Sequence, residues 1–391
     1  MSYRKLKADY LFDGFKMQMG GVLICMENGI IETIVDEDQA GEGIENFSGI
    51  LSPGLINCHC HLELSYLKGL IQEKRGLVDF VLSVVSSRQL PEELKLAAIL
   101  KAESEMLKTG VVAVGDICNT SDTRFLKSAS GLDYYNFIEV LGWSPRHAHT
   151  RFEQGKKTAG QFIEKGADEK YISLNPHAPY SVSNELWNLI EPGFGGKTIT
   201  IHNQESDSEN EFFMSGKGDL TRMYELMKMD SDHFNAPGTR SLHFYLPKLK
   251  SASRILLVHN TYTNETDLIE ALNYNDNLFF CFCPNANIYI EDQLPDIPLF
   301  LKYKTRIVLG TDSLASNHHL SILEEMKTIK DAFKQISTSE LLLWATSNGA
   351  AALSLEESLG TFRKGKKPGV VLIENAAGGE ITDLSRSRRL I

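Results

Sequence analysis

The chain has 391 residues and a formal net charge of −11, with 42% hydrophobic and 23% charged residues. This balance is ordinary for a folded globular protein and excludes disorder as the main state. The acidic net charge argues against binding to nucleic-acid phosphates, and no apolar run is long enough to span a membrane. The N-terminal stretch MSYRKLKADYLFDGF lacks the apolar core of a signal peptide, so we expect a cytoplasmic protein.

The two ends of the chain share one kind of pattern. Residues 1–50 contain short alternating strands that are separated by Gly-Gly and Asn-Gly turns, and the C-terminal segment KPGVVLIENAAGG contains one more strand. We therefore expect residues 1–50 and 366–391 to form a small composite β-sandwich domain.

The middle of the chain alternates between apolar runs and helical patterns. Continuous apolarity is typical of strands that are buried on both faces, as in a parallel sheet. Eight such runs are present: GLINCHCH (54–61), VVAVGD (111–116), YYNFIEVLG (134–142), YISLNPH (171–177), KTITIH (197–202), RILLVH (254–259), LFFCFCP (278–284) and TRIVLGTD (305–312). Helices are predicted over 91–110 and over 264–273, where Asn264 is the expected N-cap. The pattern predicts a (β/α)8 TIM barrel over residues 51–365.

One connection is much longer than the others. It covers residues 203–253, and a loop of this length in a barrel is usually functional. It contains Arg240. Its acidic residues Asp207, Glu209 and Glu211 are expected to form a solvated helix start.

Metal-binding residue types stand where the predicted strands end. His59 and His61 end the first run, His202 the fifth and His259 the sixth, and Asp312 follows the eighth. The carboxyl ends of barrel strands meet at one mouth, and strand residues two apart face the same side. Three imidazole nitrogens and one carboxylate oxygen suit one Zn²⁺ ion and leave a position for water; Fe²⁺ uses the same ligands and stays the alternative.

Glu205 is a further candidate near these ligands. It lies three residues after His202, so its carboxylate can reach a metal-bound water without binding the metal; a solvated loop glutamate is the alternative.

The six cysteines form no C-x-x-C pair and are expected to be reduced.

Two rival motifs are excluded. The sequence His61-Leu62-Glu63 matches the H-x-E half of the small zinc deaminases, but the P-C-x-x-C half is missing. Glycine-rich phosphate-binding loops are also absent from the sequence.

The strand-end segments resemble a known family. PGLINCHCH, IHNQE, LLVHN and LGTDSLASN are similar to the amidohydrolase superfamily, in its mononuclear deaminase branch. Together with HCHLELS, AVGDICN, FIEVLG, PHAPYSVS and CPNAN, they look most like the aminodeoxyfutalosine deaminases of menaquinone biosynthesis. The resemblance covers residues 50–365 and implies one divalent metal ion bound by His59, His61, His202 and Asp312. It also implies that Glu205 is the proton shuttle and that His259 holds the attacking hydroxide by a hydrogen bond.

The resemblance further implies the reaction and the substrate class. Binuclear members carry a modified lysine at the fourth strand, and YISLNPH has none, which favours a single metal ion. Hydrolysis would release ammonia from an aminopurine nucleoside, with 6-amino-6-deoxyfutalosine preferred. His177 and Glu63 would contact the substrate, and Arg240 or Arg75 would bind its benzoate.

Other functions remain open at this point. They are deamination of S-adenosylhomocysteine, adenosine or guanine, and removal of chloride or cleavage of an amide by the same metal site. An inactive barrel is disfavoured because all five metal-site positions are present. The expected partner is a small molecule, and the formation of a homodimer stays open.

Overall fold

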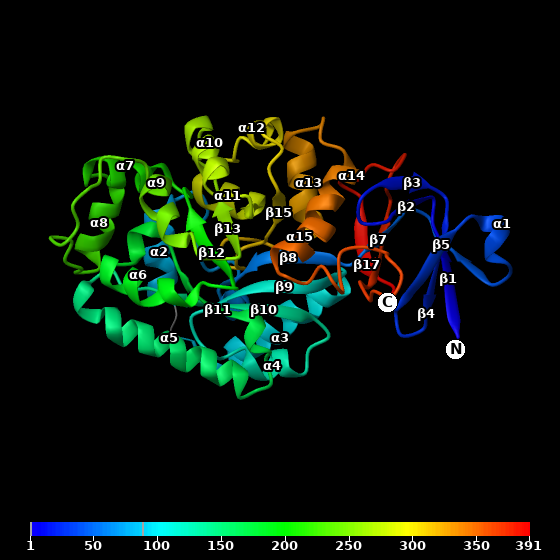
Figure 1. The fold of residues 1–391 in the computed structure, drawn as a ribbon, viewed down its shortest axis with the longest axis horizontal. Helices are drawn as coiled ribbons and strands as arrows, with labels where there is room; N and C mark the ends of the chain where they lie inside the picture. Colours follow the sequence, from blue (N-terminus) through cyan, green and yellow to red (C-terminus); the bar gives the residue numbers. More distant parts are fainter. Residues whose placement is uncertain (1, 88–89) are drawn as a thin grey trace.

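The protein consists of a barrel and a small β unit that lie side by side (Figure 1). The structure, a computed structural model, describes residues 2–87 and 90–391. Both termini belong to the β unit and lie at one end of the molecule, and α7 and α8 lie at the other end (Figure 1). Among the described residues, no helix combines the length and the apolarity needed to cross a membrane.

All eight apolar runs form strands, and they make two parallel four-stranded sheets with the orders β11-β10-β9-β8 and β12-β13-β14-β15. The strands are β8 (Leu55–Cys60), β9 (Val111–Cys118), β10 (Asp133–Val140), β11 (Ile172–Pro176), β12 (Thr198–Asn203), β13 (Arg254–His259), β14 (Leu278–Phe282) and β15 (Ile307–Leu309). Nearly every residue in them is buried, as expected for strands covered on both faces. The predicted α/β barrel class is confirmed.

The two sheets meet at two seams. At one seam Cys60 forms a parallel bridge with Asp312, whose N–H donates to the carbonyl of His59 at 3.0 Å. At the other seam the N–H of His202 donates to the carbonyl of His177 at 2.9 Å. Both seams therefore join residues at the carboxyl ends of strands, on the rim where the predicted metal ligands stand.

Helices cover the outside of the barrel. They are α2 (Leu77–Ser86), α3 (Glu92–Lys108), α4 (Arg124–Ser128), α5 (Ala148–Ile163), α6 (Asn184–Ile190), α7 (Asp207–Ser215), α8 (Asp219–Leu226), α9 (Ser241–Tyr245), α10 (Glu265–Tyr274), α11 (Pro284–Glu291), α12 (Ile297–Lys302), α13 (Ile322–Ala332), α14 (Thr338–Leu343) and α15 (Gly349–Ala352), whereas α1 (Glu37–Ala40) belongs to the small β unit (Figure 1). The predicted N-cap of α10 is confirmed, because the Asn264 side chain accepts a hydrogen bond from the N–H of Asp267.

The small β unit contains two sheets, with the orders β5-β4-β1-β6 and β17-β16-β7-β2-β3. Its strands are β1 (Tyr3–Lys7), β2 (Tyr10–Phe12), β3 (Met17–Met19), β4 (Val22–Met26), β5 (Ile31–Val35), β6 (Ile44–Asn46), β7 (Ile50–Pro53), β16 (Val370–Glu374) and β17 (Arg386–Arg389). Leu6, Leu23 and Leu372 belong to the buried cluster of this unit. Because β7 pairs with β16, residues 51–53 join the small unit, although the predicted boundary assigned them to the barrel.

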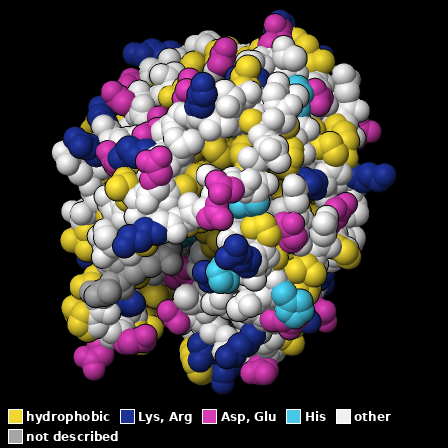
Figure 2. All heavy atoms as spheres, turned by 90° about the vertical axis from the view of Figure 1, so that its left-hand side faces the viewer, with side chains coloured by type: hydrophobic (Ala, Val, Ile, Leu, Met, Phe, Trp, Pro, Cys, Tyr) yellow, Lys and Arg dark blue, Asp and Glu magenta, His cyan; other side chains and the backbone are white. Residues whose placement is uncertain are grey.

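The long connection between β12 and β13 is a loop only in part. The helix start predicted at Asp207, Glu209 and Glu211 is confirmed as the start of α7, and two more helices follow that were not predicted. The connection forms α7, α8 and α9, and its side chains Phe212 and Tyr224 pack with Trp143 in one buried cluster. Glu209, however, is not solvated as predicted. Its carboxylate is buried and accepts hydrogen bonds from the N–H of Gln204, at 3.0 Å, and from the Ser241 hydroxyl. On this end of the molecule acidic and basic side chains are intermingled (Figure 2).

Candidate metal centre

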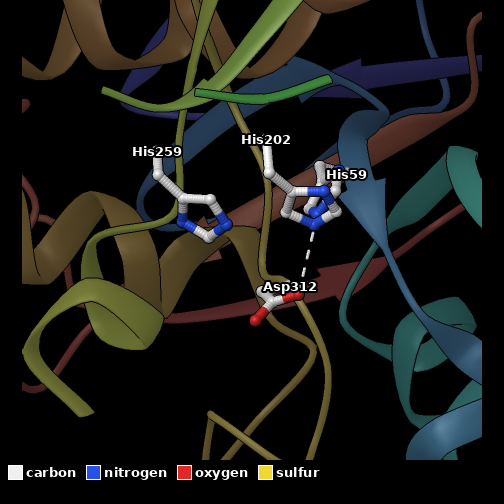
Figure 3. Close-up of side chains that lie close together, drawn as sticks. All are labelled: His59, His202, His259 and Asp312. Carbon is white, nitrogen blue, oxygen red and sulfur yellow. Dashed lines mark ion pairs between the residues drawn. The ribbon is translucent and has the colours of Figure 1, made fainter. Parts of the chain in front are cut away.

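Four of the predicted metal-site residues form one buried group, drawn in Figure 3. His59 lies in β8, His202 in β12 and His259 at the end of β13, and Asp312 follows β15. One ligand atom of each residue lies within 4.8 Å of those of the other three. Segments that are far apart in the sequence therefore meet at the rim of the barrel.

His61 belongs to the same place. Its Nε2 lies 3.3 Å from Oδ1 of Asp312, and the Nε2 of His59 lies 3.6 Å from the same oxygen. The structure thus brings together all five predicted residues. The group with mutually close ligand atoms contains His259, whereas the resemblance gave His61 as the third imidazole ligand. The division of roles between His61 and His259 stays a prediction.

The buried polar atoms of this group fit a metal ion. Both ring nitrogens of His59, Nδ1 of His61 and Nε2 of His259 are buried and have no hydrogen-bond partner. Buried polar atoms nearly always have a partner, so such a convergence needs a ligand to explain it. The Nδ1 of His202 bonds the carbonyl of His177 at 2.7 Å, which leaves its Nε2 for a metal. Imidazole nitrogens and one carboxylate oxygen form the donor set of a zinc site with an open position.

The protonation states also suit metal binding, which needs neutral imidazoles and an ionised carboxylate. Burial lowers the pKa of His61 to about 3 and holds the pKa of His202 well below its ordinary value. Burial alone would raise the pKa of Asp312, but the adjacent imidazoles, His59 first and then His61, lower that pKa well below the usual range. The Ser316 hydroxyl donates to Oδ2 of Asp312 and adds to this stabilisation.

Glu205 stands beside this group. Its Oε1 lies 3.6 Å from Nε2 of His259, and it is not one of the four residues with close ligand atoms. Burial, followed by the charge of Asp312, raises the pKa of Glu205 well above its ordinary value. A turn at Gln204, whose φ is +45°, directs Glu205 inward, and the Gln204 side chain is fixed by a hydrogen bond to Asp267 at 2.9 Å.

A cavity of about 160 Å³ opens above the group. Its polar lining includes His61, His177, Glu205 and Asp312. Its apolar wall comes largely from α2, through Leu77, Phe80, Val81 and Val84. The site therefore combines titratable groups at one end with an apolar wall that fits a flat ring.

Only one of the predicted substrate contacts lines this cavity, namely His177. Glu63 instead accepts hydrogen bonds from the N–H and the hydroxyl of Thr120, at 3.0 and 2.9 Å, and holds the loop after β9. Arg240 pairs with the buried Asp267 at 2.8 Å. Arg75 is exposed and is not part of the cavity lining. The predictions for Glu63 and Arg240 as substrate contacts are therefore corrected: both carry structural hydrogen bonds.

Sequence reasoning missed Glu139, which lines the cavity from the end of β10. Its Oε1 lies 3.7 Å from Nδ1 of His202, and its Oε2 accepts a hydrogen bond from Asn119 at 2.8 Å. The sequence signal that could have identified Glu139 was its position, because the segment FIEVLG ends a strand of the same barrel. A single glutamate inside an apolar run carries no motif of its own. All six cysteines are free and buried, as predicted.

Comparisons with known proteins agree with this geometry. The chain is 24% identical to the 5'-deoxyadenosine deaminase of Methanococcus vannielii, over 94% of this chain and 85% of that protein. It is 27% identical to the aminodeoxyfutalosine deaminase of Nitratiruptor sp., over 85% of this chain and 80% of that protein. The crystal structure of Helicobacter pylori aminofutalosine deaminase in complex with methylthio-coformycin has the same fold. Its TM-score is 0.81 at 22% identity, and the match covers 99% of this chain and 100% of that one.

The family is shown by a match that covers most of the chain. The model of the Amidohydrolase family matches residues 50–387, which include every residue of the metal centre. The protein is therefore a hydrolase acting on C–N bonds, with a His/His/His/Asp metal site, and it belongs to the Amidohydrolase family.

Proposed function

We propose that the protein is a deaminase that hydrolyses the exocyclic amine of an aminopurine nucleoside and releases ammonia. The observation that carries this proposal is the position of Glu205. Its buried carboxyl lies 3.6 Å from His259, beside the His59/His202/His259/Asp312 group, and lines the cavity above that group. The names of the similar proteins from Methanococcus vannielii and Nitratiruptor sp. support the same reaction class.

The residues have distinct roles in such a reaction. The His59/His202/His259/Asp312 group, with His61 beside it, would hold a divalent cation, for which we propose Zn²⁺ with Fe²⁺ as the alternative; when bound, such an ion would lower the pKa of a water molecule toward neutrality. Glu205 accepts the proton of the attacking water and delivers it to a ring nitrogen, which makes the amine-bearing carbon more electrophilic. Asp312 and His259 orient the attacking oxygen from the two sides of the site. The raised pKa of Glu205 fits a group that both accepts and donates a proton.

A second cavity supports a nucleoside that carries a large substituent. It has a volume of about 460 Å³ and shares Val81, His177 and Tyr180 with the metal cavity. Trp143 and Tyr224, which stack with 4.7 Å between ring centroids, belong to its lining. We propose that the base binds at the metal and that its 5'-substituent extends into this space.

Two arginines favour a substituent with a carboxylate. Arg146 and Arg151 line the second cavity, and guanidinium groups bind carboxylates in a bidentate geometry. They take the place that the sequence prediction gave to Arg240. The substituent of 6-amino-6-deoxyfutalosine, a substrate of menaquinone biosynthesis, carries a benzoate. This compound is therefore the preferred candidate.

The proposal is tested by measuring ammonia release from a substrate panel with the metal-loaded protein. The panel contains 6-amino-6-deoxyfutalosine, 5'-deoxyadenosine, adenosine, S-adenosylhomocysteine and guanine, together with a chlorinated triazine assayed for chloride. We expect the highest kcat/KM for 6-amino-6-deoxyfutalosine. A preference for 5'-deoxyadenosine would support the deaminase activity but would contradict a substrate whose 5'-substituent carries a carboxylate. Chloride release without any ammonia release would contradict the deaminase activity itself.

The arginines allow a sharper comparison. In Arg151→Ala, we expect the kcat/KM for 6-amino-6-deoxyfutalosine to fall by about tenfold or more, because a charge-assisted contact is lost. Activity on 5'-deoxyadenosine, which has no carboxylate, should stay within about twofold. An equal loss of kcat/KM on both substrates would show that Arg151 does not bind the carboxylate.

A further inference from the structure

The C-P-N-A-N motif lies outside the cavity lining, yet its second asparagine contacts the metal group. The motif follows β14 and starts α11. The Oδ1 of Asn287 lies 2.7 Å from Nδ1 of His259, and both side chains are buried. An amide oxygen can only accept a hydrogen bond, so Nδ1 of His259 carries the proton. The lone pair of the neutral ring is then on Nε2, the atom that faces Glu205.

His259 needs such support because of its backbone. Its φ is +72°, a left-handed conformation that residues other than glycine rarely adopt. Such a conformation persists only where the surrounding structure fixes it. The hydrogen bond that Nδ1 of His259 donates to Asn287 holds the ring from the side opposite to the metal group.

The first asparagine of the motif ties α11 to a neighbouring helix. The N–H of Asn285 donates to Oε2 of Glu325 at 2.9 Å, and its Nδ2 donates to Oε1 at 3.0 Å. Glu325 lies in α13 and is fully buried. One carboxylate thus fixes the first turn of α11 and, with it, the position of Asn287 two residues further along.

The same carboxylate also holds the segment that carries Asp312. The Nδ2 of Asn317 donates to Oε1 of Glu325 at 2.7 Å and to the carbonyl of Thr311 at 2.8 Å. Thr311 directly precedes Asp312. A single buried residue is therefore linked to two members of the metal group that come from different strands.

We propose that Glu325, Asn285, Asn287 and Asn317 form a buried bracket that positions His259 and Asp312 for the metal ion. These four are positioning residues, because His259, Asp312 and the backbone of Thr311 lie between them and the cation. The inference rests on the proposed metal site and not on any particular substrate. It predicts that metal affinity and coordination geometry depend on side chains that do not bind the metal.

The test uses Asn287→Leu and Glu325→Gln, each of which breaks one part of the bracket. Leucine removes the acceptor for His259 at similar volume, and glutamine turns an N–H group toward donors that need an acceptor. Controls are Asn136→Leu and Glu103→Gln, which remove buried polar contacts elsewhere in the barrel (Asn136 accepts from Lys127, and Glu103 from Tyr134).

Two properties of the purified protein are measured: Zn²⁺ affinity by competition with a chromophoric chelator, and the visible spectrum of the Co²⁺-loaded form. We expect both bracket variants to bind Zn²⁺ about 10–100-fold more weakly and to show altered Co²⁺ bands, as for other residues that orient metal-ligating histidines. Asn287→Asp keeps an acceptor for His259 and should restore the affinity to within about threefold of the wild-type value. Both control variants should match the wild type.

Wild-type Zn²⁺ affinity and Co²⁺ spectra in both bracket variants would overturn the proposal. An unchanged spectrum in Asn287→Leu would also reject the protonation assigned to His259, since the opposite amide orientation would then be the correct one. If Asn287→Leu fails to fold, Glu325→Gln decides by the same two measurements. Because neither measurement uses turnover, failure of the substrate panel and failure of the bracket are distinguishable.

Discussion

At the scale of single residues, Glu205 has the role with the sharpest consequence. The substitution Glu205→Gln keeps the shape of the side chain but removes its ability to accept a proton. General acid–base groups contribute about 10²–10⁴-fold to rate, so we expect kcat to fall by at least about 100-fold. Bound metal, measured by elemental analysis, should stay at the wild-type level because Glu205 is not part of the ligand group.

Glu211→Gln is a matched control for this experiment, since Glu211 is exposed in the following helix α7. It should leave both kcat and metal content unchanged. Near-normal turnover of Glu205→Gln with normal metal content would remove Glu205 from the mechanism. Loss of metal in that variant would instead make it a ligand.

The meeting of the metal-site residues at one place could be predicted from the sequence, but the residues that support them could not. Histidines that end predicted barrel strands are expected to lie close together, because parallel strands place their carboxyl ends on one rim of the barrel. Glu139 ends a strand in the same way, but an isolated glutamate has too many other roles to be assigned. Asn287 acts through a contact across 28 residues of sequence, and no local pattern encodes that contact.

Arg240 and Glu63 show the opposite error. Both have the right chemistry for a substrate contact. Glu63 follows a predicted strand end, and Arg240 lies in the long connection that was expected to be functional. Their partners decide otherwise: Asp267 is fully buried and binds the guanidinium of Arg240, and the backbone of Thr120 binds Glu63. Buried charges must be paired, and sequence alone does not reveal which charges are buried together.

At the scale of elements, the start of α10 gives a direct test of a local sequence signal. Asn264 accepts from the N–H of Asp267, whose Oδ2 accepts from the N–H of Asn264 at 3.1 Å. Such a capping box satisfies two N–H groups that lack partners inside the helix. Asn264→Ala should therefore lower the free energy of unfolding by about 1 kcal/mol, measured by urea titration. A value equal to that of the wild type would show that the tertiary contacts of Asp267 alone fix the helix start.

The turn between β12 and α7 is predicted to make stability depend on pH. Burial raises the pKa of Glu209 to about 8, whereas a glutamate in an unfolded chain titrates near 4.3. Between these values the folded state holds a proton that the unfolded state has released, so stability falls as pH rises. The stabilisation is fully present below about pH 4.3 and is lost as pH rises through about 8.

The measurement is the free energy of unfolding of the wild type and of Glu209→Gln at pH 5.5, 6.5 and 7.5. Glutamine cannot titrate, so the stability of the wild type relative to this variant should decrease by up to about 1.4 kcal/mol per pH unit. Glu211→Gln serves as a control and should follow the wild type at every pH. Parallel curves for the wild type and Glu209→Gln would show that Glu209 is ionised in the folded protein.

The elements themselves were predicted with uneven success, for a physical reason. The eight buried strands are long, continuous apolar runs, and burial on both faces leaves a clear pattern. Residues 203–253 form helices of five to nine residues, each too short to show a helical period. Their stability comes from packing, for example of Phe212 against Phe234 at 4.4 Å between ring centroids, and such contacts are not visible in a local window.

At the scale of the whole molecule, the fold creates the metal site by closing the chain on itself. The seam between β8 and β15 joins residues more than 250 positions apart. There, the Asn57 side chain donates to the hydroxyl of Thr311 at 2.8 Å and accepts from its N–H at 3.1 Å. His59 is two residues after Asn57, and Asp312 directly follows Thr311. These bonds therefore hold His59 and Asp312 at a fixed separation. Metal binding should therefore stabilise the entire barrel and not only the rim.

Metal binding is coupled to the folding of the whole barrel. Because the residues of the metal group come from β8, β12, β13 and the segment after β15, the unfolded chain has no preformed site, and a metal that binds only the folded state raises its stability by RT ln(1 + [M]/Kd). Removal of the metal with a chelator should lower Tm and abolish activity, and Zn²⁺ should restore both. At free Zn²⁺ 100 times the Kd, the gain is about 2.7 kcal/mol.

His202→Ala provides the matched control for the metal-dependent shift. The variant lacks an imidazole that belongs to the metal group and that we predict to be a ligand, so its Tm should no longer respond to Zn²⁺ or to the chelator. A Tm of the wild type that is the same with chelator and with Zn²⁺ would mean that the buried nitrogens of His59 and His259 are satisfied without a metal. Without such an ion, the deaminase and the bracket that positions its ligands would both lose their physical basis.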